Sequence, residues 1–412
     1  MELGKIINYK KGKAPTGIKL NEELVTYLTP EYLRNKSKEI FIPDFIGKVE
    51  VNKDDLLLLW DGSNAGEFFL GKKGILSSTM VKLIFDEKEI DKIFLFYQLK
   101  FIEYFLKSQT NGSGIPHVDK EILLSINVEY FSSSEQQSIA NILSKTDQAI
   151  AHTEALIAKY TRIKTGLMQD LLTKGIDKNG KIRSEQTHEF KDSPLGRIPK
   201  EWECYLFKEI IQNFDSGWSP NCEAQPASIN EWGSLKTTSI TWDGYNSDEN
   251  KRLPLYLNPN PNLEVQFDDI LITRVGPRER VGVVVHVNDY REKLMISDNM
   301  LRLKIIPSSK IFLPFLPLML GSTSIQKDFK NKIAGLAEAQ VVINQQSIKS
   351  TFIFMPSKNE QEQIYFRHKK MNELIISENK KLSKLQSLKT GLMQDLLSGK
   401  VRAINLMKEK QN

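Results

Sequence analysis

The chain has 412 residues, of which 40% are hydrophobic and 26% are charged, and its formal net charge is +6. This length exceeds what one hydrophobic core usually serves, so we expect at least two folded domains, and the composition excludes a disordered chain. No apolar run reaches roughly 18 residues and the N-terminus has no signal-peptide pattern, so the sequence predicts no membrane span and a cytoplasmic location. The mild positive charge permits nucleic acid as a partner but does not establish it.

Residues 1–132 are predicted to form a mainly β domain with flanking helices. Short apolar runs between turn residues, such as "DDLLLLWDG" at Asp54–Gly62, predict strands. The longer apolar stretch Ile93–Ser108 predicts a helix.

Residues 133–175 are predicted to form one long helix. It begins at a capping box, "SSSE" at Ser132–Glu135, in which the serine caps the third amide and the glutamate reaches back to the first. Apolar residues follow in steps of three and four, which is the heptad pattern of a coiled coil: Ile139, Ile142, Thr146, Ala149, Thr153, Leu156, Tyr160, Ile163 and Leu167. At 1.5 Å per residue such a helix is about 60 Å long and needs a partner for its apolar stripe.

Residues 176–356 contain a polar linker and a second domain that is similar to the first. The glycines and prolines of 173–202 rule out a continuous helix there. "DDILITRVG" at Asp268–Gly276 matches "DDLLLLWDG", while "GWSP" and "SDNMLRL" match "GKAP" and "SSTMVKL" of the first domain. The offsets between these matches drift, which indicates loop insertions around a shared scaffold, and such loops are where binding specificity usually varies.

Residues 357–412 are predicted to form a second long helix that repeats the first. "KTGLMQDLL" occurs at Lys164–Leu172 and again at Lys389–Leu397, an offset of 225 positions (389 minus 164), and a second capping box stands at Ser357–Glu360. We expect the two helices to pair antiparallel about a pseudo-two-fold axis, so that each copy docks against the opposite globular domain. Gly166 and Gly391 are expected to allow close approach of another backbone. An ordinary core helix in an α-domain is the alternative.

Catalytic motifs are weak. "GEFFLGKK" at Gly66–Lys73 has lysine where a phosphate-binding loop needs serine or threonine. Pro43-Asp44 with Asp86–Lys88 is too loosely spaced to predict a nuclease, and Cys204 and Cys222 lack metal-ligand spacing. The sequence therefore predicts a non-catalytic chain without cofactor or metal.

The chain resembles the specificity subunits of type I restriction-modification enzymes. "EQQSIANIL", "KTGLMQDLL" and "PLGRIPKEW" look like that family's helix start, helix end and lead into the second recognition domain, and "WDGSNAGEFFLGKKGILSSTM" and "DILITRVGPRERVGVVV" look like its recognition-domain cores. The resemblance implies an α+β fold with two homologous mainly β target recognition domains, separated by two long antiparallel coiled-coil helices. It also implies that each domain reads one half of a bipartite double-stranded DNA site, and that the helices set the spacing and recruit two methyltransferase subunits, with restriction-translocase subunits joining the complex.

The candidate contacts follow from that expectation. DNA contacts are expected at Lys10, Lys11, Lys13, Lys72, Lys73, Asn111, Ser113, His117, Trp218, Lys236, Arg274, Arg278, Arg280 and Gln340. Helix pairing and partner binding are expected at Ile139, Leu156, Ile163, Gly166, Leu167, Met168, Leu171, Leu385, Leu388, Gly391, Leu392, Met393 and Leu396. Two other functions remain open: a free-standing regulator that binds bipartite DNA, and an enzyme activity within the chain.

Overall fold

The computed structural model describes residues 1–15, 24–110, 115–335 and 340–403. It divides into two compact units: unit 1 is Met1–Ile157 with Glu378–Asn412, and unit 2 is Ala158–Ser377. Each unit combines a β-rich part with portions of two long helices, α4 (Ser133–Thr173) and α8 (Lys358–Leu397). The expected mixture of β-rich domains with long helices is confirmed. Within the described ranges, no helix is long and apolar enough to cross a membrane.

Unit 1 is built on two four-stranded sheets. The first has the order β1-β8-β5-β6 and is antiparallel throughout, and the second has the order β3-β2-β7-β4, in which only β2 and β7 run parallel. The strands are β1 (Asn8–Lys11), β2 (Leu24–Leu28), β3 (Ile40–Pro43), β4 (Glu50–Val51), β5 (Leu56–Leu59), β6 (Phe68–Leu70), β7 (Gly74–Leu76) and β8 (Met80–Ile84). The helices are α1 (Pro30–Leu33), α2 (Lys92–Ser108), which fulfils the predicted helix, and α3 (Lys120–Ser125).

Unit 2 repeats the antiparallel sheet of unit 1 in the order β12-β21-β17-β19. Its strands are β12 (Ile211–Ser216), β17 (Ile270–Thr273), β19 (Val284–His286) and β21 (Met300–Ile305). A smaller sheet contains β13 (Gly233–Leu235), β16 (Asn250–Arg252) and β20 (Leu294–Met295). Strand pairs are formed by β9 (Phe190–Ser193) with β10 (Gly196–Pro199), β11 (Glu203–Leu206) with β23 (Phe352–Met355), β14 (Ile240–Thr241) with β15 (Gly244–Tyr245), and β18 (Val275–Gly276) with β22 (Val341–Val342). The helices are α5 (Leu316–Leu320), α6 (Thr323–Lys332) and α7 (Gln345–Lys349).

The two sheets share irregular backbone details as well as strand order. Asp54 and Asp268 both have a left-handed backbone, with φ of 65° and 67°. The Asp54 amide donates to Gly71 at 2.9 Å, and the Asp268 amide donates to Val287 at 2.8 Å. A left-handed non-glycine residue is uncommon, so the same one at the same strand start indicates that the two β-rich parts are homologous.

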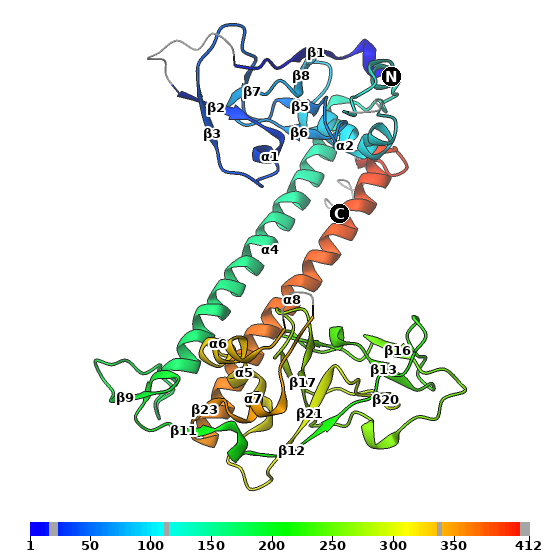
Figure 1. Ribbon diagram of the computed structural model, residues 1–412. Coiled ribbons are helices and arrows are strands. Elements are labelled where there is room, and N and C mark those ends of the chain that lie inside the picture. The colour runs from blue at the N-terminus through cyan, green and yellow to red at the C-terminus, as the bar shows by residue number, and fades with distance from the viewer. Residues whose placement is uncertain (16–23, 111–114, 336–339, 404–412) are drawn as a thin grey trace, which may run out of the picture. The chain divides into compact units, whose positions relative to one another are not determined.

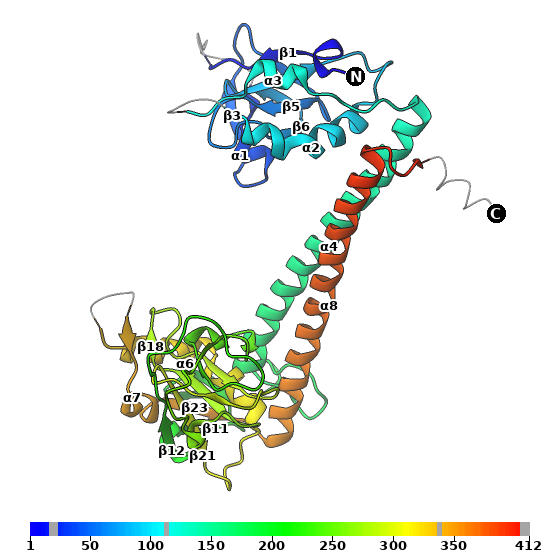
Figure 2. The same cartoon turned by 90° about the vertical axis from the view of Figure 1, so that its right-hand side faces the viewer.

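Within each unit, the portions of the two long helices run side by side in opposite directions (Figures 1 and 2). Their buried face includes Ile139, Leu143 and Thr153 on α4, each at most 1% exposed, and Ile364 on α8, which is fully buried. Ile163 and Leu388 are instead 44% and 52% exposed, so their expected place in the pairing face is wrong. After Ile139 the face steps by four residues to Leu143 rather than by three to Ile142, and this shift brings the half-buried Lys164 and Lys389 to the face in their place.

The glutamates of the two expected capping boxes have a different role from the predicted one. Ser357 does accept from the Glu360 amide at 3.3 Å, as a cap should. The side chain of Glu360, however, accepts from Arg183 and Trp202, and that of Glu135 accepts from Arg402 at 2.7 Å. Each helix start is therefore tied to the segment that follows the end of the other long helix, because a buried carboxylate is stabilised more by a guanidinium than by a local amide.

The two copies of the repeated stretch complete the two cores. Leu171 and Leu172 belong to the core of unit 2 with Trp202 and Phe354, and Leu396 and Leu397 belong to the core of unit 1. Gly166 and Gly391 make no close approach: a Cβ added at either would have no atom of the described chain within 4 Å. The expectation of a backbone contact at these glycines is wrong, because both lie on the exposed side of their helix.

Candidate nucleic-acid interface

Loops converge at one end of the four-stranded sheet in each unit. In unit 1, β1 and β5 end where β8 begins, as the pairing of Lys11 with Val81 and of Leu59 with Met80 shows. In unit 2, Ser216 pairs with Leu301 and Thr273 with Met300 in the same way. We call this region the loop end; it consists of residues 11–13, 60–65, 77–79 and 115–118 in unit 1, and 216–219, 274–281, 297–299 and 340–343 in unit 2.

The backbone of the loop end is the same in both units. The Trp60 amide donates to Thr79 at 2.9 Å, and the Arg274 amide donates to Asn299 at 2.9 Å. The carbonyls of Trp60 and Arg274 in turn accept from Val118 and Ile343, each at 2.9 Å. Trp60 and Arg274 therefore occupy equivalent positions, one aromatic and one cationic.

Two glycines allow the first loop to pass over the turn before the next strand. A Cβ at Gly12 would lie 2.0 Å from the Ser77 carbonyl oxygen, and one at Gly217 would lie 2.2 Å from the Ser297 carbonyl oxygen. Neither distance is possible for a real side chain, so the conformation depends on glycine at both places. The two units therefore share the backbone conformation of the loop end, while the side chains on this backbone can differ between them.

In unit 1 the loop end carries a small polar cluster. Lys11 forms an ion pair with Asp61 at 2.7 Å, and Asp61 is bridged to His117 through the backbone. Lys10, Lys13 and His117 are exposed. The predicted contacts Asn111 and Ser113 lie outside the described residues.

Lys72 and Lys73 are not part of this cluster. They follow β6, next to the start of β5, so they lie at the opposite end of the sheet from Lys11. Lys72 donates to Asn35 at 2.9 Å and lies 4.3 Å from the centre of the Tyr32 ring. The structure thus separates two of the predicted lysines from the others.

In unit 2 the loop end collects most of the predicted contacts. Trp218 follows Gly217, Arg274 and Arg278 lie in the β17–β19 connection, and the exposed Gln340 precedes β22. The Nε of Arg274 is buried and has no hydrogen-bond partner among the described residues. Asp298 lies beside them; its carboxylate accepts from the Ser219 hydroxyl.

Lys236 and the loop-end Arg280 both act on one carboxylate, that of Glu249. The Nζ of Lys236 lies 3.6 Å from Glu249. The Thr238 hydroxyl, then the charge of Lys236, and more weakly that of Arg280, lower the pKa of Glu249. One carboxylate therefore neutralises part of a basic surface that includes Lys236 and Arg280.

The structure adds residues that were not predicted as contacts. Tyr9 stacks on Trp60 with ring centres 4.9 Å apart, and Asp61 forms the ion pair with Lys11. The match of "DDLLLLWDG" with "DDILITRVG" could have identified both Trp60 and Asp61, because it aligns them with Arg274 and Val275. Trp60 and Asp61 were not among the predicted contacts because those were chosen mainly by positive charge, and an aromatic ring and an acid are not obvious partners of DNA.

Comparison with known proteins gives full-length similarity to one class. A family model described as the type I restriction modification DNA specificity domain matches residues 1–162. The type I restriction enzyme MjaVIII specificity subunit of Methanocaldococcus jannaschii is 36% identical over 418 residues, covering 98% of this chain and 93% of that protein. The EcoEI specificity subunit of Escherichia coli is 38% identical over 182 residues, covering 43% of this chain and 30% of that protein.

Among solved structures, the S subunit of the type I restriction-modification system of M. genitalium has the same fold. Its TM-score is 0.61 at 17% identity, and the match covers 96% of this chain and 95% of that one.

Proposed function

Since this chain belongs to the family of type I restriction-modification specificity subunits, we propose that the loop end of each unit reads one half of a bipartite double-stranded DNA site. We assign the first recognition domain to residues 1–132, and a linker with the second recognition domain to residues 176–356. The observation that carries the proposal is the shared loop-end backbone with unlike side chains, Trp60 and Asp61 against Arg274 and Val275. One frame with two sets of side chains suits two half-sites of different sequence.

The side chains of unit 2 suit guanine-containing base pairs. Arginine makes bidentate contacts with the two acceptors on the guanine edge, and Arg274 and Arg278 are placed on the loop end. Lys236 and Arg280 carry charge that phosphate groups attract, which positions a duplex without reading its sequence.

Unit 1 suits a different mode of reading. A phosphate that attracts Lys11 would release Asp61, and a carboxylate in the major groove accepts from the amino group of cytosine. Lys13 and His117 would then contact the backbone. We assign no role in this half-site to Lys72 or Lys73, which lie at the other end of the sheet.

The test compares variants on a site first identified by methylome sequencing of the source cell. Arg274→Ala or Arg278→Ala should weaken discrimination at one half-site by about 1 to 3 kcal/mol and leave the other half-site unchanged. Arg197→Ala is the matched control, because Arg197 is an exposed arginine of the same unit on the β9–β10 hairpin. Equal losses at both half-sites, measured with duplexes altered in one half at a time, would contradict reading by separate units.

We further propose that the two repeated stretches bind two methyltransferase subunits in equivalent orientations, and that restriction-translocase subunits join this assembly. The support is that both copies expose the same residues: Thr165, Gly166 and Gln169 in unit 2, and Thr390, Gly391 and Gln394 in unit 1. Identical exposed strips on equivalent helices can hold identical partners. The proposal assigns recognition and assembly to this chain and no chemical step.

The partner sites can be blocked without touching a core. Truncation after Leu388 would also remove Leu396 and Leu397 from the core of unit 1, so a bulky substitution is the cleaner change. Gly391→Trp and Gly166→Trp each add a side chain where an added Cβ meets no described atom. Native mass spectrometry of the reconstituted complex should show one methyltransferase subunit with either variant and none with both, whereas Ser383→Trp, exposed about two turns earlier, should still bind two. Two tightly bound subunits on the double variant would refute the assignment.

A further inference from the structure

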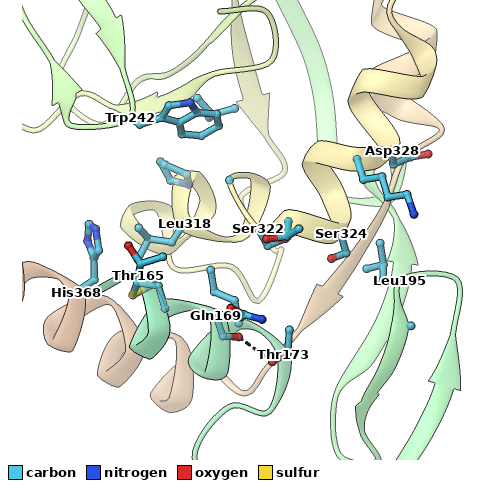
Figure 3. Close-up of a pocket in the computed structure, with 18 of the residues that line it drawn as sticks. Thr165, Gln169, Thr173, Leu195, Trp242, Leu318, Ser322, Ser324, Asp328 and His368 are labelled. Carbon is cyan, nitrogen blue, oxygen red and sulfur yellow. Dashed lines mark hydrogen bonds between the residues drawn. The ribbon is translucent and has the colours of Figure 1, made fainter. Parts of the chain in front are cut away.

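Unit 2 contains a cavity that shares no residue with the loop end. Its volume is about 860 Å³, within the range of small-molecule sites. It is lined by the end of α4, the β9–β10 turn, the α5–α6 connection and Trp242 (Figure 3). Met168, Leu195 and Leu318 contribute apolar walls. The cavity is therefore a candidate ligand site separate from the proposed DNA interface.

The corresponding position in unit 1 holds a larger residue. The amides of Asp91 and Phe312 donate to Gln136 and Gln361, which are equivalent residues of the two repeats. Counting six residues onward, Tyr97 of unit 1 corresponds to Leu318 of unit 2. The Tyr97 hydroxyl donates to Asp147 at 2.8 Å, whereas Leu318 lines the cavity. Leu318 therefore lines the cavity at a position where unit 1 has a tyrosine.

The N-terminus of α6 forms part of the cavity wall and holds a buried hydroxyl without a partner in the described chain. Ser322 is the N-cap residue, is only 5% exposed and does not cap the helix with its side chain. Its Oγ has no hydrogen-bond partner in the described part of the chain. The first-turn amides of an α-helix also lack intrahelical acceptors and carry the positive end of the helix dipole. Ser322 and Ser324 both line the cavity (Figure 3).

The charged residues around the cavity favour an anion. Lys164 and Lys327 line it, and the one lining carboxylate, Asp328, is paired with Lys332 at 2.6 Å. Burial, together with the charge of Lys164, lowers the pKa of His368 to about 4, so this lining imidazole is neutral at pH 7. Two lysines and a helix N-terminus thus face a cavity whose only lining acid is already neutralised.

Trp242 supplies a flat surface beside this positive end. A Cβ at Gly321 would lie 2.9 Å from the Trp242 ring, so the glycine lets the ring lie against the turn that precedes Ser322. Trp242 remains 48% exposed. A buried hydroxyl, a helix N-terminus and an accessible aromatic ring therefore lie next to one another.

We propose that this cavity binds a small organic anion, whose carboxylate or phosphate group accepts hydrogen bonds from Ser322 and the first amides of α6 and whose flat apolar part rests beside Trp242. Burying an unpaired hydroxyl is unfavourable, and a ligand acceptor removes that cost. The site is independent of DNA reading, so it adds a ligand-binding function to unit 2.

The probes are benzoate, phenyl phosphate and the uncharged benzyl alcohol, titrated into the full chain by calorimetry. Benzoate or phenyl phosphate should bind and benzyl alcohol should not, and the bound anion identifies which group the site prefers. Ser322→Ala should weaken that binding about tenfold, the usual effect of losing a hydrogen bond to a charged group. Ser239→Ala is the matched control, because Ser239 is also a buried serine whose Oγ has no partner in the described chain, and it lies outside both the cavity and the loop end.

Binding should also be visible at one residue that reports on the cavity. An anion beside Lys164 offsets the charge that helps lower the pKa of His368, so saturating benzoate should raise that pKa in an NMR titration. Leu318→Tyr, which introduces the residue of unit 1, should abolish binding while circular dichroism stays unchanged. Absence of binding by both anions, or equal affinities of the Ser322→Ala and Ser239→Ala variants, would overturn the proposal.

Discussion

Glu360→Gln should destabilise unit 2 strongly, because Glu360 is the acceptor for a buried cation. Arg183 donates to it through both terminal nitrogens, at 2.5 and 3.2 Å, and the Ile176 amide and Trp202 Nε1 donate at 2.8 and 3.2 Å. The side chains of Arg183 and Glu360 are 5% and 7% exposed. Glutamine keeps the shape and one acceptor but removes the buried negative charge, so that only the exposed Glu201 remains as a carboxylate partner of the guanidinium.

The magnitude follows from that burial. Breaking a buried ion pair by removing one partner costs about 3 to 5 kcal/mol. With an m-value of about 3 kcal/mol/M, the urea midpoint of unit 2 should fall by about 1 to 1.7 M. Tryptophan fluorescence, to which the fully buried Trp202 beside the pair contributes, reports the transition.

Glu201→Gln is the matched control for this prediction. Glu201 bonds to the same guanidinium at 2.6 Å, but its side chain is 68% exposed. An exposed pair contributes at most about 1 kcal/mol, so this variant should unfold close to the wild type. Similar midpoints for the two variants would refute the argument that burial of Glu360 determines its contribution.

Two further changes test the packing. Gly391→Ala should stabilise unit 1 by about 1 kcal/mol, because alanine is the better helix former and a Cβ at this position would have no described atom within 4 Å. Gly12→Ala should destabilise unit 1, because its Cβ would collide with the Ser77 carbonyl oxygen. Urea unfolding measures both effects, and a loss of stability in Gly391→Ala would contradict the open position. The pKa of His368 is about 4 in the folded chain and 6.5 for an unperturbed histidine, the value expected in the unfolded chain. Between these two pH values the unfolded state binds more protons than the folded state, so unit 2 should lose stability as the pH falls from 6.5 towards 4. His368→Leu should remove that part of the pH dependence, and an unchanged slope would show that the imidazole is not held neutral.

The sequence was sufficient for the duplication but not for the pairing register of the helices. A constant offset of 225 positions identified two long helices, and α4 and α8 begin within one residue of the expected positions. Steps of three and four can follow Ile139 in either order, and periodicity alone does not choose between Ile142 and Leu143. The choice depends on which residue meets the partner helix, so Ile163 and Leu388 were assigned to the wrong side.

At the loop end, residue type predicted some members and misplaced others. Arg274 and Arg278 come directly after a recognisable strand, so their position at a strand end followed from the pattern. Lys73 also follows a strand, but alternate strands of an antiparallel sheet end on opposite sides, and strand order is not written in a local pattern. The roles of Glu135 and Glu360 were missed for a similar reason, because their arginine partners lie far away in the sequence.

The closing of unit 1 by the last part of the chain fixes an order of completion during synthesis. Unit 2 is one continuous segment, whereas unit 1 is formed from two segments. In unit 1, Gln98 donates to Leu397, 299 positions away, and Glu135 pairs with Arg402, 267 positions away. Between Ile157 and Arg402 the ribosome adds 245 residues (402 minus 157), which takes about 12 to 50 s at 5 to 20 residues per second. Unit 1, most of which is synthesised first, is therefore the last unit to complete its core. During that interval its exposed apolar surface and the unpaired Glu135 are available to a chaperone that binds nascent chains.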